Sequence, residues 1–107
     1  MSIITFISDF GYSDHYVASV KASIYKLNSN LNIVDISHNI KKYSISHAAH
    51  LIKNVYTDFP QGTIHIIAVK ASGKEVRIIV VKMNEHYFVT YDTGIFTLIN
   101  LKDNYTA

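Results

Sequence analysis

Two carboxylates, Asp9 and Asp14, lie in the loop that follows the first apolar segment of the chain. Each can accept two hydrogen bonds, which suits the two hydroxyls of a ribose or the ammonium group of a substrate. Ligands of open α/β sheets bind beyond the carboxyl ends of the strands, so this loop is the first candidate for a binding site. The alternative is structural, with Asp14 capping a helix and Asp9 stabilising a turn.

Other patterns in the chain give less support to a site. The loop has a single glycine, Gly11, so it carries neither a dinucleotide-binding fingerprint nor a phosphate-binding P-loop. His47 and His50, with His38 before them, have few carboxylates nearby and no HExxH pattern. We therefore interpret the two helix histidines as solvated and expect no metal. The Asp-Ile-Ser-His cluster at 35–38 is interpreted as a turn bonded to local backbone.

The apolar periodicity predicts the elements that position this loop. A nearly continuous β-branched run at 3–7 indicates a strand buried on both faces, as in a parallel sheet. Helical spacing of apolar residues alternates with further short apolar runs. The pattern predicts strands at 3–7, 32–36 and 63–69 and helices at 16–27 and 45–59, the first capped by Ser13 or Asp14 and the second by Ser44.

The second half of the chain changes to a hairpin pattern. Apolar runs at 77–83 and 86–91 are separated by two turn residues, a short strand is expected at 95–98, and the polar residues 102–107 are expected to fray. The order βαβαβ implies right-handed crossovers and a sheet covered by helices. We expect an α/β fold, a Rossmann-like three-layer domain with a mainly parallel sheet followed by a β-hairpin.

Composition excludes several classes. The 107 residues include no Cys, which excludes a disulfide framework, a thiolate zinc site and a Cys nucleophile, and favours a reducing cytoplasm. Ten scattered Lys and Arg against eight Asp and Glu give a charge of only +2, so we expect no nucleic-acid partner. No apolar run approaches the roughly 20 residues of a membrane span, and the N-terminus lacks the basic region of a signal peptide. We expect a soluble cytoplasmic protein without a membrane partner.

Several segments in order resemble one family. Residues 4–17, ITFISDFGYSDHYV, are similar to the opening I-T-L-x-T-D-F-G-x-x-D-x-Y-V of the S-adenosylmethionine (SAM) hydroxide adenosyltransferases, which are related to SAM-dependent chlorinases and fluorinase. Residues 33–40, IVDISHNI, resemble the family's I-V-D-I-T-H-x-I, and the likeness continues through 59–65, FPQGTIH. The agreement extends over residues 3–97.

The resemblance implies a reaction and a site. In this family water or hydroxide attacks C5′ of SAM and gives adenosine and methionine, with no metal or other cofactor. By resemblance Asp9 would hold the ribose hydroxyls, Asp14 would approach the methionine moiety, and Ser8 stands where the family has Thr. Family sites form between subunits of a homotrimer.

The chain also departs from the family pattern. Lys70 replaces an Asp that is thought to activate the water together with an Arg, kept here as Arg77, and a His whose counterpart would lie beyond Ala107. An ammonium group near a sulfonium would repel it, and the alternative is that Lys70 is a solvated loop residue. The following Pro-Asp-Asn-Gly turn of the family is here 91–94, YDTG.

We therefore expect a SAM hydrolase-like protein with Arg77 as candidate catalytic residue and Asp9, Asp14 and Ser8 as candidate substrate-binding residues. The alternatives are a non-catalytic SAM- or adenosine-binding module and an inactive fragment. Residues 1–101 are expected to form an incomplete N-terminal domain of this type and 102–107 a tail, with the family's C-terminal β-barrel domain absent from this chain.

Overall fold

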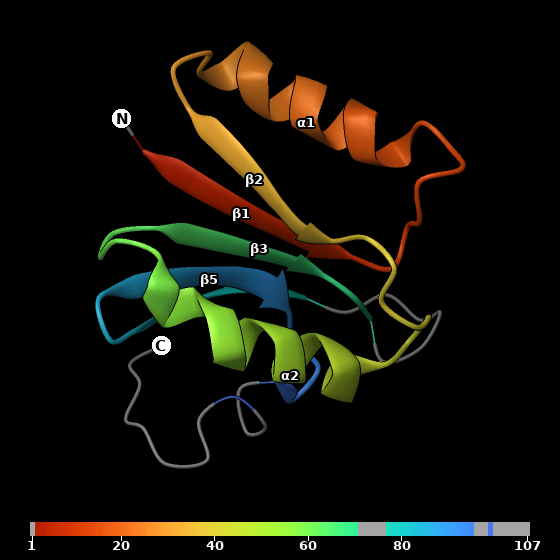
Figure 1. Cartoon of the computed structure of the whole chain (residues 1–107), viewed down its shortest axis with the longest axis vertical. Coiled ribbons are helices and arrows are strands. Elements are labelled where there is room, and N and C mark those ends of the chain that lie inside the picture. Colours follow the sequence, from red (N-terminus) through yellow and green to blue (C-terminus); the bar gives the residue numbers. More distant parts are fainter. Residues whose placement is uncertain (1, 71–76, 96–98, 100–107) are drawn as a thin grey trace.

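The computed structural model describes residues 2–70, 77–95 and 99 (Figure 1). Within these ranges, two α-helices and five strands follow one another in the expected order. The elements are β1 (Ile3–Ser8), α1 (Tyr16–Leu27), β2 (Asn32–Ser37), α2 (Ile45–Val55), the 3₁₀ turn η1 (Tyr56–Asp58), β3 (Ile64–Ala68), β4 (Ile78–Met83) and β5 (His86–Tyr91). No helix among these described parts is long and apolar enough to cross a membrane.

One five-stranded sheet has the order β2-β1-β3-β5-β4. The first four strands in this order run parallel, and β4 pairs antiparallel with β5 at the edge. The chain moves from β1 outward to β2 and then back past β1 to β3. Right-handed crossovers in these opposite directions place α1 and α2 on opposite faces of the sheet. The predicted α/β fold, βαβαβ followed by a hairpin, is confirmed.

The two faces of the sheet are covered unequally. Figure 1 shows α1 beside β2 at one side of the sheet and α2 beside β5 at the other. The α2 helix buries Ala48, Ala49 and Ile52 in the main hydrophobic cluster, which includes Ile7 of β1 and Phe88 of β5. In α1 only Val17 is buried. The larger part of the core therefore lies between α2 and the sheet, as the strong apolar stripe of this helix predicts.

The predictions made for the caps and ends of the two helices are partly correct. The Ser44 cap is confirmed, because its hydroxyl accepts a hydrogen bond from the N–H of His47. The predicted cap of α1 is wrong: the capping position is His15, and no side chain bonds the free N–H groups there. The α2 helix ends at Val55 and tightens into η1, where the sequence predicted helix to residue 59.

The chain after β5 is described only in part. Ile95 has helical rather than extended backbone, so the strand predicted at 95–98 does not begin there, and residues 96–98 lie outside the described residues. Ile95 and Ile99 are both buried in the main cluster. The tail predicted at 102–107 also lies outside the described residues. The division of the chain at residue 101 therefore stays a prediction.

Candidate functional site

The carboxyl ends of the parallel strands meet at one edge of the sheet, where a cavity of about 250 Å³ opens. Its walls come from the loop after β1, the loop before α2, and the ends of β3 and β5. The lining residues are Asp9, Phe10, Lys42, Tyr43, Ala68, Lys70 and Tyr91. This is the edge at which open α/β sheets bind their ligands.

Asp9 is the only carboxylate among the described residues that line the cavity. Its Oδ2 accepts a hydrogen bond of 3.4 Å from the backbone N–H of Tyr43, and within the described chain its side chain makes no ion pair. Tyr43 reaches this position with a left-handed backbone, φ 63°. A non-glycine residue pays on the order of 1 kcal/mol for that conformation. The carboxylate is therefore held at one oxygen and keeps the other for a ligand.

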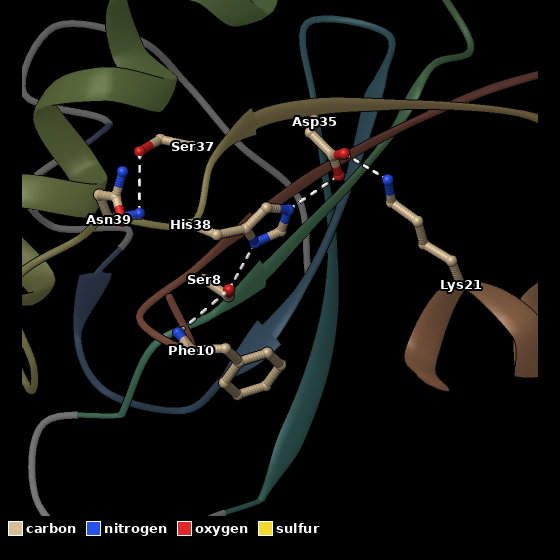
Figure 2. A network of polar contacts seen from close by, with 7 residues as sticks. All are labelled: Ser8, Phe10, Lys21, Asp35, Ser37, His38 and Asn39. Atoms are coloured by element: carbon tan, nitrogen blue, oxygen red, sulfur yellow. Dashed lines mark hydrogen bonds and ion pairs between the residues drawn. The ribbon is translucent and has the colours of Figure 1, made fainter. Parts of the chain in front are cut away.

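The turn that presents Asp9 is supported from beneath by a buried polar network (Figure 2). Ser8 Oγ lies 2.5 Å from Nδ1 of His38, and Nε2 of the same imidazole lies 2.8 Å from Oδ1 of Asp35. Asp35 also pairs with Lys21 of α1 through Oδ2. Ser8 and His38 are both fully buried. The network thus joins α1, β2 and the end of β1.

The partners determine the direction of each hydrogen bond. Because the Asp35 carboxylate can only accept, Nε2 of His38 donates to it, and in the neutral ring Nδ1 then accepts from the Ser8 hydroxyl. Ser8 Oγ in turn accepts from the backbone N–H of Phe10 at 3.2 Å. The backbone N–H of Gly11 donates to the carbonyl of His38 at 2.7 Å. His38 therefore fixes both ends of the turn that contains Asp9.

The backbone of Gly11 and the charge of Asp35 explain why these residue types stand at these positions. Gly11 has φ 72°, a left-handed conformation that glycine adopts without steric cost. Burial raises the pKa of Asp35, but hydrogen bonds from His38 and Lys21 and the charge of Lys21 outweigh it and lower the pKa below its ordinary value of 3.8. Asp35 is therefore ionised at neutral pH and orients the His38 ring.

The other predicted site residues lie apart from the cavity. Asp14 is exposed in the loop before α1 and does not line the cavity. The Arg77 side chain is 82% exposed, and its Nη2 donates to Oδ2 of Asp92 at 2.8 Å. The N–H of Asp92 donates to the carbonyl of Arg77, so the pair links the start of β4 to the end of β5. The structure thus brings Asp9 and Lys70 together, with Ser8 beneath them, and leaves Asp14 and Arg77 outside.

Sequence reasoning missed part of this site. Lys42, Tyr43 and Tyr91 line the cavity; Lys42 and Tyr43 sit in a segment that carries no recognised motif, and Tyr91 opens the 91–94 segment that departs from the family's turn. The turn interpretation of the cluster after β2 is correct for Ser37, whose hydroxyl accepts from the N–H of Asn39. It is incomplete for His38, whose ring bonds a residue of another strand. The sequence did offer a signal for this contact, because Asp35 and His38 lie at the end of a strand that was predicted to pair in the same sheet as β1.

The two helix histidines considered for a metal site, His47 and His50, make local contacts. His47 Nδ1 accepts from the N–H of Lys41 at 3.3 Å. His50 lies 3.4 Å from the amide nitrogen of Asn54, one turn along α2. Within the described ranges no three His, Asp or Glu side chains are arranged to hold a metal ion.

Comparisons with known proteins agree with this architecture. A sequence model described as the SAM hydroxide adenosyltransferase N-terminal domain matches residues 4–106. The chain is 33% identical over 105 residues to an (R)-S-adenosyl-L-methionine hydrolase of Methanocaldococcus jannaschii, covering 92% of this chain and 40% of the hydrolase. It is 28% identical over 82 residues to a fluorinase of Actinopolyspora mzabensis, covering 76% of this chain and 27% of the fluorinase.

A solved structure has the same fold. An uncharacterized conserved protein from Thermotoga maritima superposes with a TM-score of 0.88 at 30% identity, over 96% of this chain and 40% of that one. The chain therefore spans less than half the length of these proteins, and its similarity to the hydrolase and to the Thermotoga maritima protein covers nearly all of its own length.

Proposed function

The chain belongs to the SAM hydroxide adenosyltransferase family, whose N-terminal domain it matches, and from that premise we propose that its cavity binds the adenosyl group of SAM. The observation that carries this proposal is the carboxylate of Asp9 at the carboxyl end of β1, in the wall of the cavity and with one oxygen free. A carboxylate so placed accepts from both hydroxyls of a ribose.

The size of the cavity supports binding of part of the ligand. Pockets that enclose small molecules measure about 300–1,000 Å³, and this one measures about 250 Å³. Phe10, Tyr43 and Tyr91 give it aromatic walls against which a sugar or a base can pack. We propose that the described residues supply the ribose side of the site and that further walls come from outside them.

The proposed reaction is hydrolysis of SAM. A water oxygen forms a bond to C5′, the C5′–S bond breaks, and its electron pair leaves with sulfur as methionine; the water gives up one proton. Neither a metal nor another cofactor is needed, because the sulfonium sulfur is already a good leaving group. Asp9 is the one carboxylate of the described cavity lining, and it is committed to the ribose. We propose that the base that takes the proton lies outside the described residues.

The remaining candidates keep defined roles in this proposal. Arg77 is the candidate catalytic residue, and it must leave Asp92 to reach a water in the cavity. Asp14 must move toward the cavity to meet the methionine moiety, since it is exposed in the loop before α1. Ser8 is buried under the turn and acts by holding it rather than by touching substrate. By resemblance we further propose a homotrimer and a cytoplasmic location.

A non-catalytic SAM- or adenosine-binding module is the second candidate. It is favoured by the placement of Lys70 in the cavity and of Arg77 outside it. An ammonium group is not a base at neutral pH unless its pKa is strongly lowered. The two candidates share the same binding site and differ only in whether adenosine is released.

The test is a calorimetric titration of the chain with adenosine and with SAM, followed by assay for adenosine and methionine. Asp9→Asn removes the negative charge to which the ribose hydroxyls donate, and this should weaken adenosine binding by about 10- to 100-fold. Asp14→Asn is the matched control and leaves adenosine binding unchanged, because adenosine lacks the methionine part. SAM cleavage supports the hydrolase, and saturable binding without cleavage supports the binding module. Equal adenosine affinity of Asp9→Asn and the unaltered chain contradicts the proposed site.

A further inference from the structure

Two lysines line the same cavity as Asp9 and come from different segments. Lys42 lies in the loop before α2, and Lys70 lies just after β3. The ammonium nitrogen of Lys42 lies 5.5 Å from the ring centroid of Tyr43, and that of Lys70 lies 5.1 Å from the ring centroid of Tyr91. Both rings also line the cavity. Cation–π attraction therefore favours ammonium positions against the cavity walls.

Neither lysine is neutralised by a carboxylate in the part of the chain that the structure describes. Some other cations there do have acidic partners: Lys21 pairs with Asp35, and Arg77 with Asp92. Asp9 makes no ion pair with either lysine. The described lining of the cavity thus carries two positive charges and one negative charge. The net charge of this lining is therefore positive, and it attracts a negatively charged ligand group.

We propose that Lys42 and Lys70 form an anion subsite beside Asp9, which takes a negatively charged group attached to the 5′ side of an adenosyl ligand. The inference rests on the proposed adenosyl binding and adds which 5′ substituents the site selects. The carboxylate in the methionine part of SAM meets this requirement, and so does the phosphate of an adenosine phosphate. A ligand that carries the sulfonium charge without an anion is repelled by the same lysines.

The expected selectivity follows from the charges. An ion pair near a protein surface, over a distance of about 4 Å, changes affinity by roughly tenfold once solvent screening is included. SAM should therefore bind about tenfold more tightly than decarboxylated SAM, which keeps the sulfonium and the amine but lacks the carboxylate. Adenosine monophosphate should likewise bind about tenfold more tightly than adenosine. Both advantages should shrink in high salt, whereas the affinity for neutral adenosine should not.

The experiment is calorimetry with these four ligands on the unaltered chain and on lysine variants. Lys70→Met should reduce both advantages several-fold, each taken as the ratio of two affinities measured on the same variant. Lys70→Glu should reverse the order of SAM and decarboxylated SAM. Lys53→Met is the matched control, because Lys53 is exposed on α2 and does not line the cavity. Thermal unfolding of each variant shows whether it remains folded.

The outcomes distinguish a carboxylate from a phosphate as the bound anion, and the anion subsite from the adenosyl site. An advantage for SAM alone supports a carboxylate subsite, and an advantage for the monophosphate alone supports a phosphate subsite. Adenosine binding without any advantage of the anionic ligands overturns the subsite and leaves the adenosyl site standing. Failure of all four ligands to bind at millimolar concentration overturns both.

Discussion

Strand β1 carries two buried hydroxyls, and each bonds a fully buried histidine. Ser8 Oγ lies 2.5 Å from Nδ1 of His38, and Thr5 Oγ1 lies 2.6 Å from Nδ1 of His65. Because side chains alternate along a strand and the two hydroxyls are three residues apart, they lie on opposite faces of the sheet. The same pair of functional groups is thus placed in two different surroundings.

The difference lies at the far nitrogen of each ring. His38 Nε2 meets the ionised carboxylate of Asp35, and the contacts lead on to Lys21 at the surface. His65 Nε2 meets a second histidine, His86, at 3.0 Å. The His65 ring stacks on Phe88 and contacts Tyr56 edge-on, under α2 and η1.

The comparison indicates what each network is for. The contacts of His38 end at the backbone of the turn that presents Asp9, so this histidine connects the sheet to the cavity. The contacts of His65 end among buried side chains between β1, β3 and β5. We expect the first network to affect ligand binding and the second to affect stability.

Acid should break the His65 network with the largest effect. Burial, with a smaller contribution from the charge of His86, lowers the pKa of His65 from 6.5 to about 4. The unfolded chain therefore takes up this proton first, so the stability due to neutral His65 is complete above pH 6.5 and is lost as the pH falls toward 4. The free energy of unfolding should fall over that interval by on the order of 3 kcal/mol.

Urea unfolding at pH 7, 5.5 and 4 measures this loss. His65→Gln serves as the reference, because the amide keeps a donor and an acceptor but does not titrate. The unaltered chain should lose more stability than this variant as the pH falls. Parallel curves for the two proteins would assign the acid sensitivity to other groups.

The second test replaces each hydroxyl of β1. Ser8→Ala leaves His38 Nδ1 and the N–H of Phe10 without their partner, and Thr5→Val leaves His65 Nδ1 without one. Loss of a buried partner costs about 1–3 kcal/mol in either case. Only Ser8→Ala should also weaken adenosine binding, by several-fold, because only this hydroxyl supports the turn at Asp9.

Chemical denaturation and calorimetry on the same two variants separate these effects. Equal losses of stability with unequal losses of affinity support the division of roles. If Thr5→Val weakens adenosine binding as much as Ser8→Ala, the two networks do not differ in function.

The smallest effect is expected at the outer end of the His38 network. Asp35→Asn removes the ion pair with Lys21, but its amide oxygen still accepts from His38 Nε2. Partly exposed ion pairs contribute less than about 1 kcal/mol. Because the pKa of Asp35 is lowered in the folded chain, this contribution is present above pH 3.8 and is lost as the pH falls below that value.

Unfolding of Asp35→Asn, Lys21→Met and the double variant at low and high salt measures this pair. The two single variants and the double variant should lose the same small amount of stability, and high salt should reduce the difference from the unaltered chain. A double variant that loses the sum of both single losses would show that the two side chains do not act as a pair.

The sequence determined the elements and their order. Nearly continuous β-branched runs specify buried strands and a 3.6-residue apolar period specifies α2, because these patterns depend only on neighbours along the chain. Asp9 was found in the same way, as a carboxylate directly after β1. Both ends of α1 were predicted as well, but its N-terminal cap was not, because His15 occupies the capping position without a capping bond and local residue preferences do not report this.

Only the tertiary structure decided which side chains meet. Lys42 and Lys70 share a cavity because β3 returns beside β1 and the loop before α2 crosses over both, with Tyr43 held in a left-handed backbone. His38 bonds Ser8, thirty residues earlier, because the strand that precedes it lies next to β1. Such contacts depend on the order of the strands and on the backbone path of the loops. Because they join residues far apart in the sequence, no local pattern predicts them.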